Sequence, residues 1–546
     1  MLRRVVLALL AGGLLSLAYE PVAIAYLMPV ALAGYALTTR GIRSRAGFLV
    51  GLAFGIGFYF PHIYWLSPSI GPAAWIGLAG AEAASYGVLG ALAPILHRLR
   101  AWPFWLAAAW VTVEMTRSVW PFSGMPLGRL GFGVVDTPLA PALAYLGVNG
   151  VSFLVAALGF LLARVVLAAR GDERLLAVGG LVGLAAVSVV PSVAPWTLAT
   201  SGQVTVAAVQ GNVPGRGDDV LFDSRQLTQN HVDATVALAA DVAAGTVARP
   251  DFVVWPENST AIDPFADPGI NLQVRTAVAA IGVPVLVGAI VDAGEKHILN
   301  QGIVWDPETG PGDRYAKRHP VAYGEYIPLR SLLQPTGITD SGQLARVPRD
   351  MLSGSRVDPL RIAGVAVADA ICFDIAYDDG LATQIEHGAE LLTVQTSNAS
   401  FIFTDQVDQQ FAITRARAIE SGKYVVVAAT NGISGVIAPD GSVVDRTQRR
   451  TQDVLVETVD LRPGVTPGVR VGRDFRVLAP ASTLVGLVLG FLTYSRRHPG
   501  ATDRPRRTRR RARRADVDGP DRDGHPDLQR GSQPRLDRAA SPRGPA

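Results

Sequence analysis

The chain has 546 residues, of which 49% are hydrophobic, and it carries 50 Lys and Arg against 46 Asp and Glu. This length is unusual for one soluble domain, and the charge is uneven: residues 1–200 hold six acidic side chains, whereas residues 496–546 hold fifteen arginines and seven aspartates. The single cysteine, Cys372, excludes an internal disulfide and a cysteine-built metal cage.

The first part of the chain is a series of apolar segments. A membrane span needs about 20 mostly apolar residues, and candidates lie at 4–19, 22–38, 46–65, 72–96, 102–119, 138–168 and 174–194, with an eighth at 478–494. The 138–168 segment is long enough to be tilted or broken. The first segment follows Arg3 and Arg4 as in a signal peptide, but six further segments favour a retained helix.

The charged loops indicate an orientation for these segments. Cytoplasmic loops carry an excess of Lys and Arg. With the N-terminus in the cytoplasm, every second loop is basic: residues 40–45, 97–100 and 164–174 face inside, as do Arg496 and Arg497, and Arg129 is an exception outside. We therefore expect both termini in the cytoplasm and the segment between the seventh and eighth spans outside.

Two charged residues lie one helical turn apart inside an apolar segment. Glu114 and Arg117 belong to the run WVTVEMTRSVW, and ionised groups in hydrocarbon are costly. They are expected to pair or to face a polar cavity. A structural ion pair and a contact with a phospholipid head group both remain open.

Residues 203–470 show the pattern of a globular α/β domain. Apolar, β-branched runs predict strands at 204–213, 251–257, 284–291, 298–306, 364–374, 391–397, 424–430 and 434–439, and amphipathic runs predict helices at 223–244, 271–281, 380–387 and 405–421. Near-continuous apolar strands indicate sheets that are covered on both faces. The segment is therefore expected to be a layered α/β domain.

Three polar residues stand at the ends of buried strands in this domain. Glu257 ends DFVVWPE, where partial desolvation would make its carboxylate a usable base, although such residues are more often loop or helix-cap residues. Lys317 is one of three lysines in an arginine-rich chain, and an ammonium can lower a thiol pKa or stabilise an oxyanion; a surface lysine is the alternative. Cys372 is a core residue or a nucleophile.

Together the three residue types predict acyl chemistry. A thiolate can take an acyl group as a thioester and pass it to an oxygen acceptor, which is hydrolysis, or to an amine, which gives an amide. The composition does not choose between these acceptors. An acyl donor or acceptor in the bilayer would explain why the domain is held at a membrane.

The motifs resemble a known family. Glu257 in WPE, Lys317 in YAKRHPVAYGEYIP and Cys372 in ICFD, in that order, resemble the Glu-Lys-Cys triad of the nitrilase (carbon-nitrogen hydrolase) superfamily. The closer resemblance is to the apolipoprotein N-acyltransferase family, an eight-span membrane family with a nitrilase-like domain inserted before the last span. Further segments carry it: QGNVP (210–214), WPEN (255–258), GEYIP (324–328) and RARAIESGKYVVVAATNGISGVI (415–437).

The resemblance implies a fold and a layout. A multi-pass α-helical membrane domain of about eight spans would carry an extracytoplasmic nitrilase-like α/β sandwich. The expected parts are 1–196 with seven spans, 203–470 as the catalytic domain, 478–495 as the eighth span, and 496–546 as a basic, disordered cytoplasmic tail. The implied location is the bacterial cell membrane.

The resemblance also implies a reaction. Cys372 would take an acyl chain from a phospholipid, typically phosphatidylethanolamine, and the N-terminal amine of a diacylglyceryl-cysteine on a lipoprotein would then take it from the thioester. Glu257 would be the general base, Lys317 the oxyanion stabiliser, and Glu325 a supporting carboxylate. The implied partners are membrane lipids and diacylated lipoproteins, with no metal, organic cofactor or nucleic acid.

The sequence departs from the family motif at two places. An aspartate, Asp374, stands where the family has glutamate, and Ala399 stands where the family commonly has aspartate after Ser397-Asn398. The alternative function is a membrane-tethered amidase or nitrilase that transfers the acyl group to water. A transporter or scaffold with an inactive enzyme domain is a third, weaker hypothesis.

Overall fold

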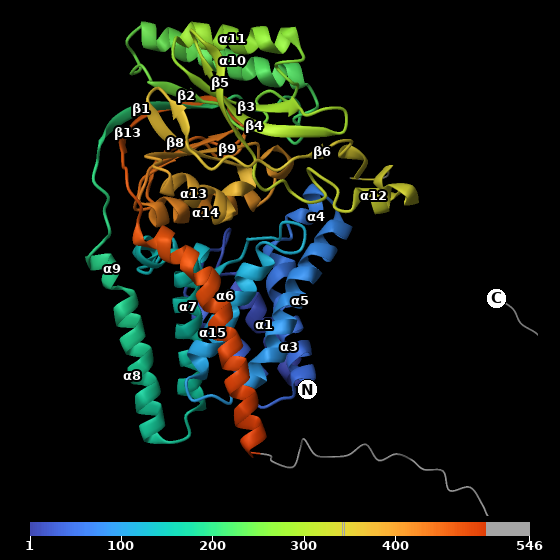
Figure 1. The fold of residues 1–546 in the computed structure, drawn as a ribbon, viewed down its shortest axis with the longest axis vertical. Helices are drawn as coiled ribbons and strands as arrows, with labels where there is room; N and C mark the ends of the chain where they lie inside the picture. Colours follow the sequence, from blue (N-terminus) through green and yellow to red (C-terminus); the bar gives the residue numbers. More distant parts are fainter. Residues whose placement is uncertain (341, 343, 498–546) are drawn as a thin grey trace, which may run out of the picture. The chain divides into compact units, whose positions relative to one another are not determined.

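The first two hundred residues form a bundle of helices (Figure 1). The computed structural model describes residues 1–340, 342 and 344–497. The elements are α1 (Leu2–Ser16), α2 (Leu27–Thr39), α3 (Ser44–His62), α4 (Leu66–Ser69), α5 (Pro72–Leu96), α6 (Trp102–Arg117), η1 (Leu130–Val134), η2 (Ala140–Ala142), α7 (Leu143–Leu167), α8 (Gly171–Ser188) and α9 (Val190–Val193). Each apolar segment predicted in this part contains a helix, with ends that differ by a few residues.

Among the described residues, four helices are long and apolar enough to cross a membrane, by length and composition. They span Pro72–Leu96, Ala140–Leu167, Gly171–Val193 and Pro467–Thr493. The last belongs to α15 (Pro467–Arg497), which begins well before the predicted 478–494. The predicted tail lies outside the described residues from position 498 onwards.

Glycines allow the central helices to pack closely. A Cβ at Gly12 of α1 would lie 2.0 Å from the Phe54 carbonyl oxygen of α3, and one at Gly51 of α3 would lie 2.1 Å from the Tyr86 oxygen of α5. Small residues at contact points are typical of helices that associate in membranes. Larger side chains there would push the helices apart.

Helix α7 is interrupted near its start, as the length of the predicted 138–168 segment suggested. Gly147 adopts φ 65° and ψ 176° inside the helix. A Cβ there would lie 2.5 Å from the Gly468 oxygen of α15 and 2.9 Å from Glu420 Oε1. The break therefore lets α7 meet both the last helix and the globular domain.

The buried charges of α6 have separate partners. Arg117 Nη1 lies 3.3 Å from Glu82 Oε2 of α5, and it also donates to the Met125 and Leu127 oxygens at 2.9 and 2.8 Å. Glu114 Oε1 instead accepts from Trp110 Nε1 at 2.8 Å and from the Leu130 amide at 3.0 Å. The ion pair of Arg117 is thus formed with another helix.

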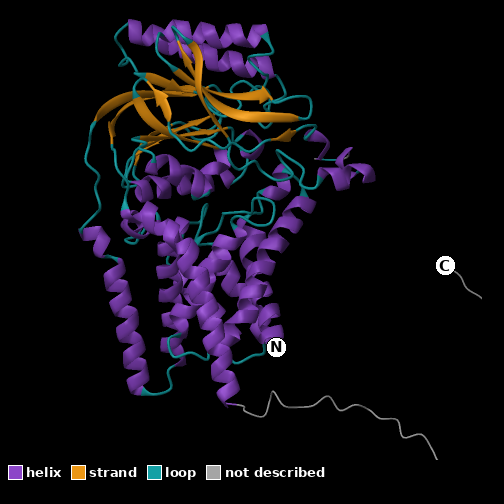
Figure 2. Ribbon diagram, viewed as in Figure 1, coloured by secondary structure: helices purple, strands orange, loops and turns teal. Residues whose placement is uncertain are grey.

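The globular domain consists of two stacked β-sheets between two layers of helices (Figure 2). Its strands are β1 (Gly202–Gln210), β2 (Phe252–Val254), β3 (Val285–Asp292), β4 (His297–Asp306), β5 (Gly310–Ala316), β6 (Asp350–Met351), β7 (Leu360–Ile362), β8 (Val365–Ile371), β9 (Leu391–Thr396), β10 (Val425–Ala429), β11 (Gly435–Ile437), β12 (Val443–Arg446) and β13 (Asp453–Leu461). One sheet has the order β13-β1-β2-β3-β4-β5, with β6 beside β4, and the other has the order β12-β11-β10-β9-β8-β7. The β1-β2-β3 and β8-β9-β10 pairings are parallel.

The helices cover the outer faces of the sheets. They are α10 (Ser224–Ala243), α11 (Pro268–Ile281), α13 (Asp379–Glu386) and α14 (Gln406–Ser421). The connections contain the short elements α12 (Arg330–Leu333), η3 (Gln334–Thr336), η4 (Ile338–Asp340), η5 (Leu344–Arg346), η6 (Cys372–Ala376) and η7 (Ala399–Phe401). One core lies between the sheets and another lies beneath α10 and α11. A third runs without interruption from the membrane helices into α13 and α14, so these helices join the two halves (Figure 1).

The predicted layered α/β architecture is therefore observed, and the four predicted helices are present. The predicted strands are present but shorter at several ends. Sequence patterns missed β5, β6, β7, β12 and β13. Of these, β13 pairs along the whole of β1, from Gly202 opposite Leu461 to Gln210 opposite Asp453.

Candidate active site

Cys372 lies directly after the buried strand β8 and begins the 3-10 turn η6. Its backbone adopts φ 53°, a left-handed conformation that is uncommon for a residue with a side chain and costs free energy. The side chain is partly accessible. The sharp turn thus presents the thiol at the end of a rigid strand.

Glu257 follows β2 and is only 3% exposed. Its Oε1 accepts hydrogen bonds from Asn300 Nδ2 at 2.8 Å and Lys317 Nζ at 2.9 Å, and its Oε2 accepts from the Ser397 amide at 2.9 Å. Both carboxylate oxygens of this buried side chain thus have hydrogen-bond donors. The carboxylate is therefore held in one orientation by groups from three strands or strand ends.

Lys317 follows β5 and is completely buried. Its Nζ contacts Glu257 and lies 2.5 Å from Glu325 Oε1. Burial alone would lower the pKa of Lys317, but the carboxylates of Glu257 and Glu325 raise it well above its usual value. The two carboxylates thus favour the ammonium form of Lys317.

Glu325 comes from the loop that follows Lys317. Its Oε2 accepts from the Val321 amide at 2.8 Å, which ties the loop to the ammonium. Burial raises the pKa of Glu325, although the Lys317 ammonium opposes that rise. The structure thus brings together Glu257, Lys317 and Glu325 by direct contact.

The Cys372 thiol shares the electrostatic environment of these residues. Burial raises its pKa to about 12, the Glu257 carboxylate adds to the rise, and the Lys317 ammonium and a hydrogen bond with Thr396 oppose it. The thiol is therefore neutral at rest and needs a base to become a nucleophile. A buried carboxylate beside it is suited to that task.

Asp374 has a role that the sequence pattern did not reveal. Its Oδ2 accepts from the Tyr315 hydroxyl at 3.0 Å and the Arg318 amide at 3.0 Å, and its Oδ1 accepts from the His319 amide at 2.8 Å. The carboxylate thus connects the Cys372 turn to the backbone just after Lys317. The shorter aspartate is long enough for these contacts.

At the second departure, Ala399, the two preceding residues still form hydrogen bonds with Glu257 and with helix α14. The Ser397 amide donates to Glu257, and Asn398 Nδ2 donates to Gln410 Oε1 of α14 at 2.8 Å. Asn398 adopts φ 57°, a conformation that asparagine tolerates better than most residues. The contacts of this segment with the site therefore do not depend on an aspartate at position 399.

A buried group of charges lies where the Cys372 turn meets the membrane helices. Arg129 is 1% exposed, and its Nη1 donates to Asp378 Oδ1 at 2.8 Å. Arg417 of α14 donates to the same Oδ1 at 2.7 Å and to the Ile375 and Ala376 oxygens at 2.9 Å each. The ring of Phe132 lies 5.1 Å from each guanidinium. The turn is thus clamped between the two halves of the chain.

No group of three or more His, Cys, Asp or Glu side chains suited to a metal ion occurs among residues 1–340, 342 and 344–497. The partners of the polar groups at the site are one another and nearby backbone amides.

Comparison with known proteins shows two family matches along the chain. Residues 11–161 match the model of the apolipoprotein N-acyltransferase N-terminal domain, and residues 205–463 match the carbon-nitrogen hydrolase model. The chain is 34% identical to the apolipoprotein N-acyltransferase of Mycolicibacterium smegmatis over 491 residues, which covers 86% of this chain and 82% of that protein. It is 32% identical to that of Ralstonia nicotianae over 526 residues, with 91% and 94% covered.

Among solved structures, the chain is similar to a mutant of the amidase from Nesterenkonia sp. AN1. The identity is 14% and the TM-score is 0.34, with 50% of this chain and 97% of that chain covered. This likeness is too limited to support an argument about the site.

Proposed function

The chain belongs to the apolipoprotein N-acyltransferase family, and we propose that it N-acylates lipoproteins through Glu257, Lys317 and Cys372, with Glu325 in support. The acyltransferase activity, its phospholipid and lipoprotein substrates and its bacterial membrane setting follow from the family. The roles of individual residues are the proposal. The observation that carries it is the buried Lys317 ammonium between Glu257 and Glu325, beside a neutral thiol.

In the first step, Glu257 takes the thiol proton of Cys372 while the sulfur attacks the ester carbonyl carbon of a phospholipid. The Lys317 ammonium donates to the oxyanion of the tetrahedral intermediate. The ester C–O bond then breaks, the lysophospholipid oxygen takes the proton back from Glu257, and a thioester remains on Cys372.

In the second step, the α-amine of a diacylglyceryl-cysteine attacks the thioester carbonyl. Glu257 receives the amine proton, Lys317 again stabilises the oxyanion, and the C–S bond breaks. The thiolate regains its proton from Glu257, and the new bond is an amide. Because the acyl group is held on Cys372 beside Glu257, the electrophile and the base are already in place when the amine binds.

We further propose a membrane topology for the chain. Seven spans lie within 1–196, the catalytic domain at 203–470 is on the extracytoplasmic side, the eighth span is at 478–495, and both termini are in the cytoplasm. The basic loops at 40–45, 97–100 and 164–174 support this orientation. The helices found at each predicted segment support the span count. Phosphatidylethanolamine is the proposed acyl donor.

The testing experiment starts with purified wild-type protein and Cys372→Ser, each incubated with acyl-labelled phosphatidylethanolamine and no acceptor. Because the chain has one cysteine, a hydroxylamine-sensitive adduct found by mass spectrometry in the wild type alone identifies the thioester on Cys372. Adding a diacylated lipopeptide should transfer the label to its amine. Release of free acid without lipopeptide acylation would instead favour the amidase alternative.

A further inference from the structure

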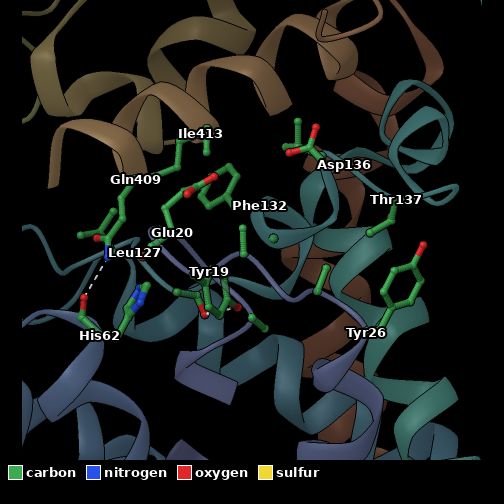
Figure 3. Close-up of a pocket in the computed structure, with 17 residues that line it drawn as sticks. Tyr19, Glu20, Tyr26, His62, Leu127, Phe132, Asp136, Thr137, Gln409 and Ile413 are labelled. Carbon is green, nitrogen blue, oxygen red and sulfur yellow. Dashed lines mark hydrogen bonds between the residues drawn. The ribbon is translucent and has the colours of Figure 1, made fainter. Parts of the chain in front are cut away.

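A separate cavity lies where the helical bundle meets the catalytic domain (Figure 3). It lies between the α1–α2 loop, the end of α3, the loop before α7 and helix α14, and its volume is about 70 Å³. Its lining includes Tyr19, Glu20, Tyr26, His62, Phe132 and Gln409, whereas Glu257, Lys317 and Cys372 do not line it. At roughly 10–15 Å³ per water, this volume suits a small head group and is too small for an acyl chain.

His62 lacks the hydrogen bonds that a buried ring normally makes. The residue is 4% exposed, and neither ring nitrogen has a partner among the described residues. Tyr19 and Phe58 pack against the ring, with centroids 4.8 and 5.2 Å away, so the ring is fixed in place. A buried polar group without a partner is costly, and a ligand in the cavity would supply the missing partner.

Glu20 contributes a carboxylate without a counter-ion. It is half-buried, and no ion pair to it is found in the part of the chain that the structure describes. Burial and the carboxylates of Asp408 and Asp136 raise the pKa of Glu20, while Arg415 opposes this. Arg415 is itself held by both oxygens of Asp136, at 3.1 and 2.6 Å.

The lining therefore favours a cation. Its charged members are Glu20 and Asp136, of which Asp136 is already paired with Arg415, so Glu20 is the carboxylate without an ion pair. No Lys or Arg belongs to the lining, and Tyr19, Tyr26 and Phe132 contribute aromatic rings. Carboxylates with aromatic rings are the groups that bind ammonium ions, whereas a phosphate would require basic donors.

The cavity is connected to the catalytic domain through α14. Gln409 Nε2 donates to the Glu20 and His62 backbone oxygens at 3.1 and 3.0 Å. The next residue, Gln410, bonds Asn398 and Thr396 beside the triad. Neighbouring residues of one helix therefore contact the cavity and the segment beside the active site, although they project from different faces of α14.

We propose that this cavity binds a primary ammonium group of a substrate, with Glu20 as its counter-ion and His62 as a hydrogen-bond acceptor. This inference rests on the proposed function and adds a specificity-determining site to it. The same chemistry is present in the ethanolamine head group of a donor phospholipid and in the α-amine of the lipoprotein acceptor.

Binding is measured in Cys372→Ala protein, so that turnover does not interfere and the result stands even if no thioester ever forms. Native mass spectrometry of detergent-solubilised protein counts bound lipids in an equimolar mixture of short-chain phosphatidylethanolamine and phosphatidylglycerol. A second mixture contains a diacylated lipopeptide and its N-acetylated form. The variants are Glu20→Gln and His62→Phe, and Glu173→Gln in the exposed first turn of α8 is the matched control.

Two preferences are compared: phosphatidylethanolamine over phosphatidylglycerol, and the free-amine lipopeptide over its N-acetylated form. We expect Glu20→Gln to lower one of them about tenfold or more, as loss of a charge-assisted contact does. Glu173→Gln should lower neither. A fall in the phosphatidylethanolamine preference identifies the donor head group, and a fall in the free-amine preference identifies the acceptor. His62→Phe keeps the ring packing and should lower the same preference. If both preferences survive Glu20→Gln, the cavity holds only solvent and the proposal is overturned.

Discussion

Arg129 and Asp378 connect the helical bundle to the turn that begins with Cys372: the guanidinium donates to both carboxylate oxygens of Asp378, at 2.8 and 3.1 Å. Arg129 lies in the loop before η1, and Asp378 lies just after the turn that begins with Cys372. Burial opposes ionisation of Asp378, but Arg129 and Arg417 hold its pKa well below its usual range. The turn that carries Cys372, the proposed nucleophile, is thus positioned partly by the bundle.

Arg129→Met should therefore destabilise the protein. The substitution leaves Asp378 with Arg417 as its remaining counter-ion, so the loss should stay below the roughly 3–5 kcal/mol typical of a buried pair whose partner is left unpaired. The thermal unfolding midpoint in detergent should fall, and kcat should fall with it because the Cys372 turn loses an anchor. Arg415→Met is the control, since Asp136 in that pair is 62% exposed and such pairs contribute about 1 kcal/mol or less. Equal midpoints for the two variants would refute the clamp.

Cys372→Ala should abolish acyl transfer while the protein stays folded. The substitution removes the proposed nucleophile but only one heavy atom from a partly accessible side chain. The unfolding midpoint should remain close to that of the wild type, and lipopeptide acylation should fall to background. Residual transfer by the pure variant would show that another group accepts the acyl chain.

The pH dependence of thiol alkylation tests the electrostatics of the site. Because the Cys372 pKa is raised to about 12, the thiolate fraction at neutral pH is very small and grows about tenfold per pH unit. Iodoacetamide labelling of the one cysteine should be slow at pH 7 and should still be rising at pH 10. A plateau at or below pH 9 would mean that the thiol is already ionised in the folded protein.

Glu257→Gln and Glu325→Gln should separate the base from the supporting carboxylate. Both substitutions keep the side-chain size, but only the first removes the group proposed to move protons. Thioester formation should fall by about 10²–10⁴-fold in Glu257→Gln, as for loss of a general base, and by much less in Glu325→Gln. Single-turnover rates measure the step directly, and a larger loss in Glu325→Gln would reverse the assignment.

Asp374→Asn should loosen the link between the Cys372 turn and the Lys317 segment. The new amide nitrogen is a donor, and it would face one of the N–H or O–H donors that hydrogen-bond to the carboxylate in the wild type. The group left without an acceptor costs about 1–3 kcal/mol. We expect a lower unfolding midpoint and a lower kcat, with Asp374→Glu retaining more activity than Asp374→Asn. Identical kinetics for wild type and Asp374→Asn would show that the link does not support catalysis.

Local patterns predicted a large part of the fold. The amphipathic run 405–421 is observed as α14, Gln406–Ser421, and the 138–168 segment is broken at Gly147. The same patterns missed β13. Its side chains are mostly partly exposed, so the strand is evident only from its pairing with β1. The rarity of lysine in this chain also did not by itself distinguish a site residue from a structural one. Lys423 is as buried as Lys317, yet it donates to the Arg462 and Gly464 backbone oxygens.

The residue types of the site, the apolar segments and the alternation of strands and helices could be predicted along the chain, since side-chain chemistry and hydrophobic periodicity are local properties. Which charges meet depends on the three-dimensional fold. Arg117 pairs with Glu82 of another helix, and Arg129 reaches Asp378 across 249 residues of chain. Such partners depend on helix packing and strand register, because a buried charge finds its counter-ion in space and not along the chain.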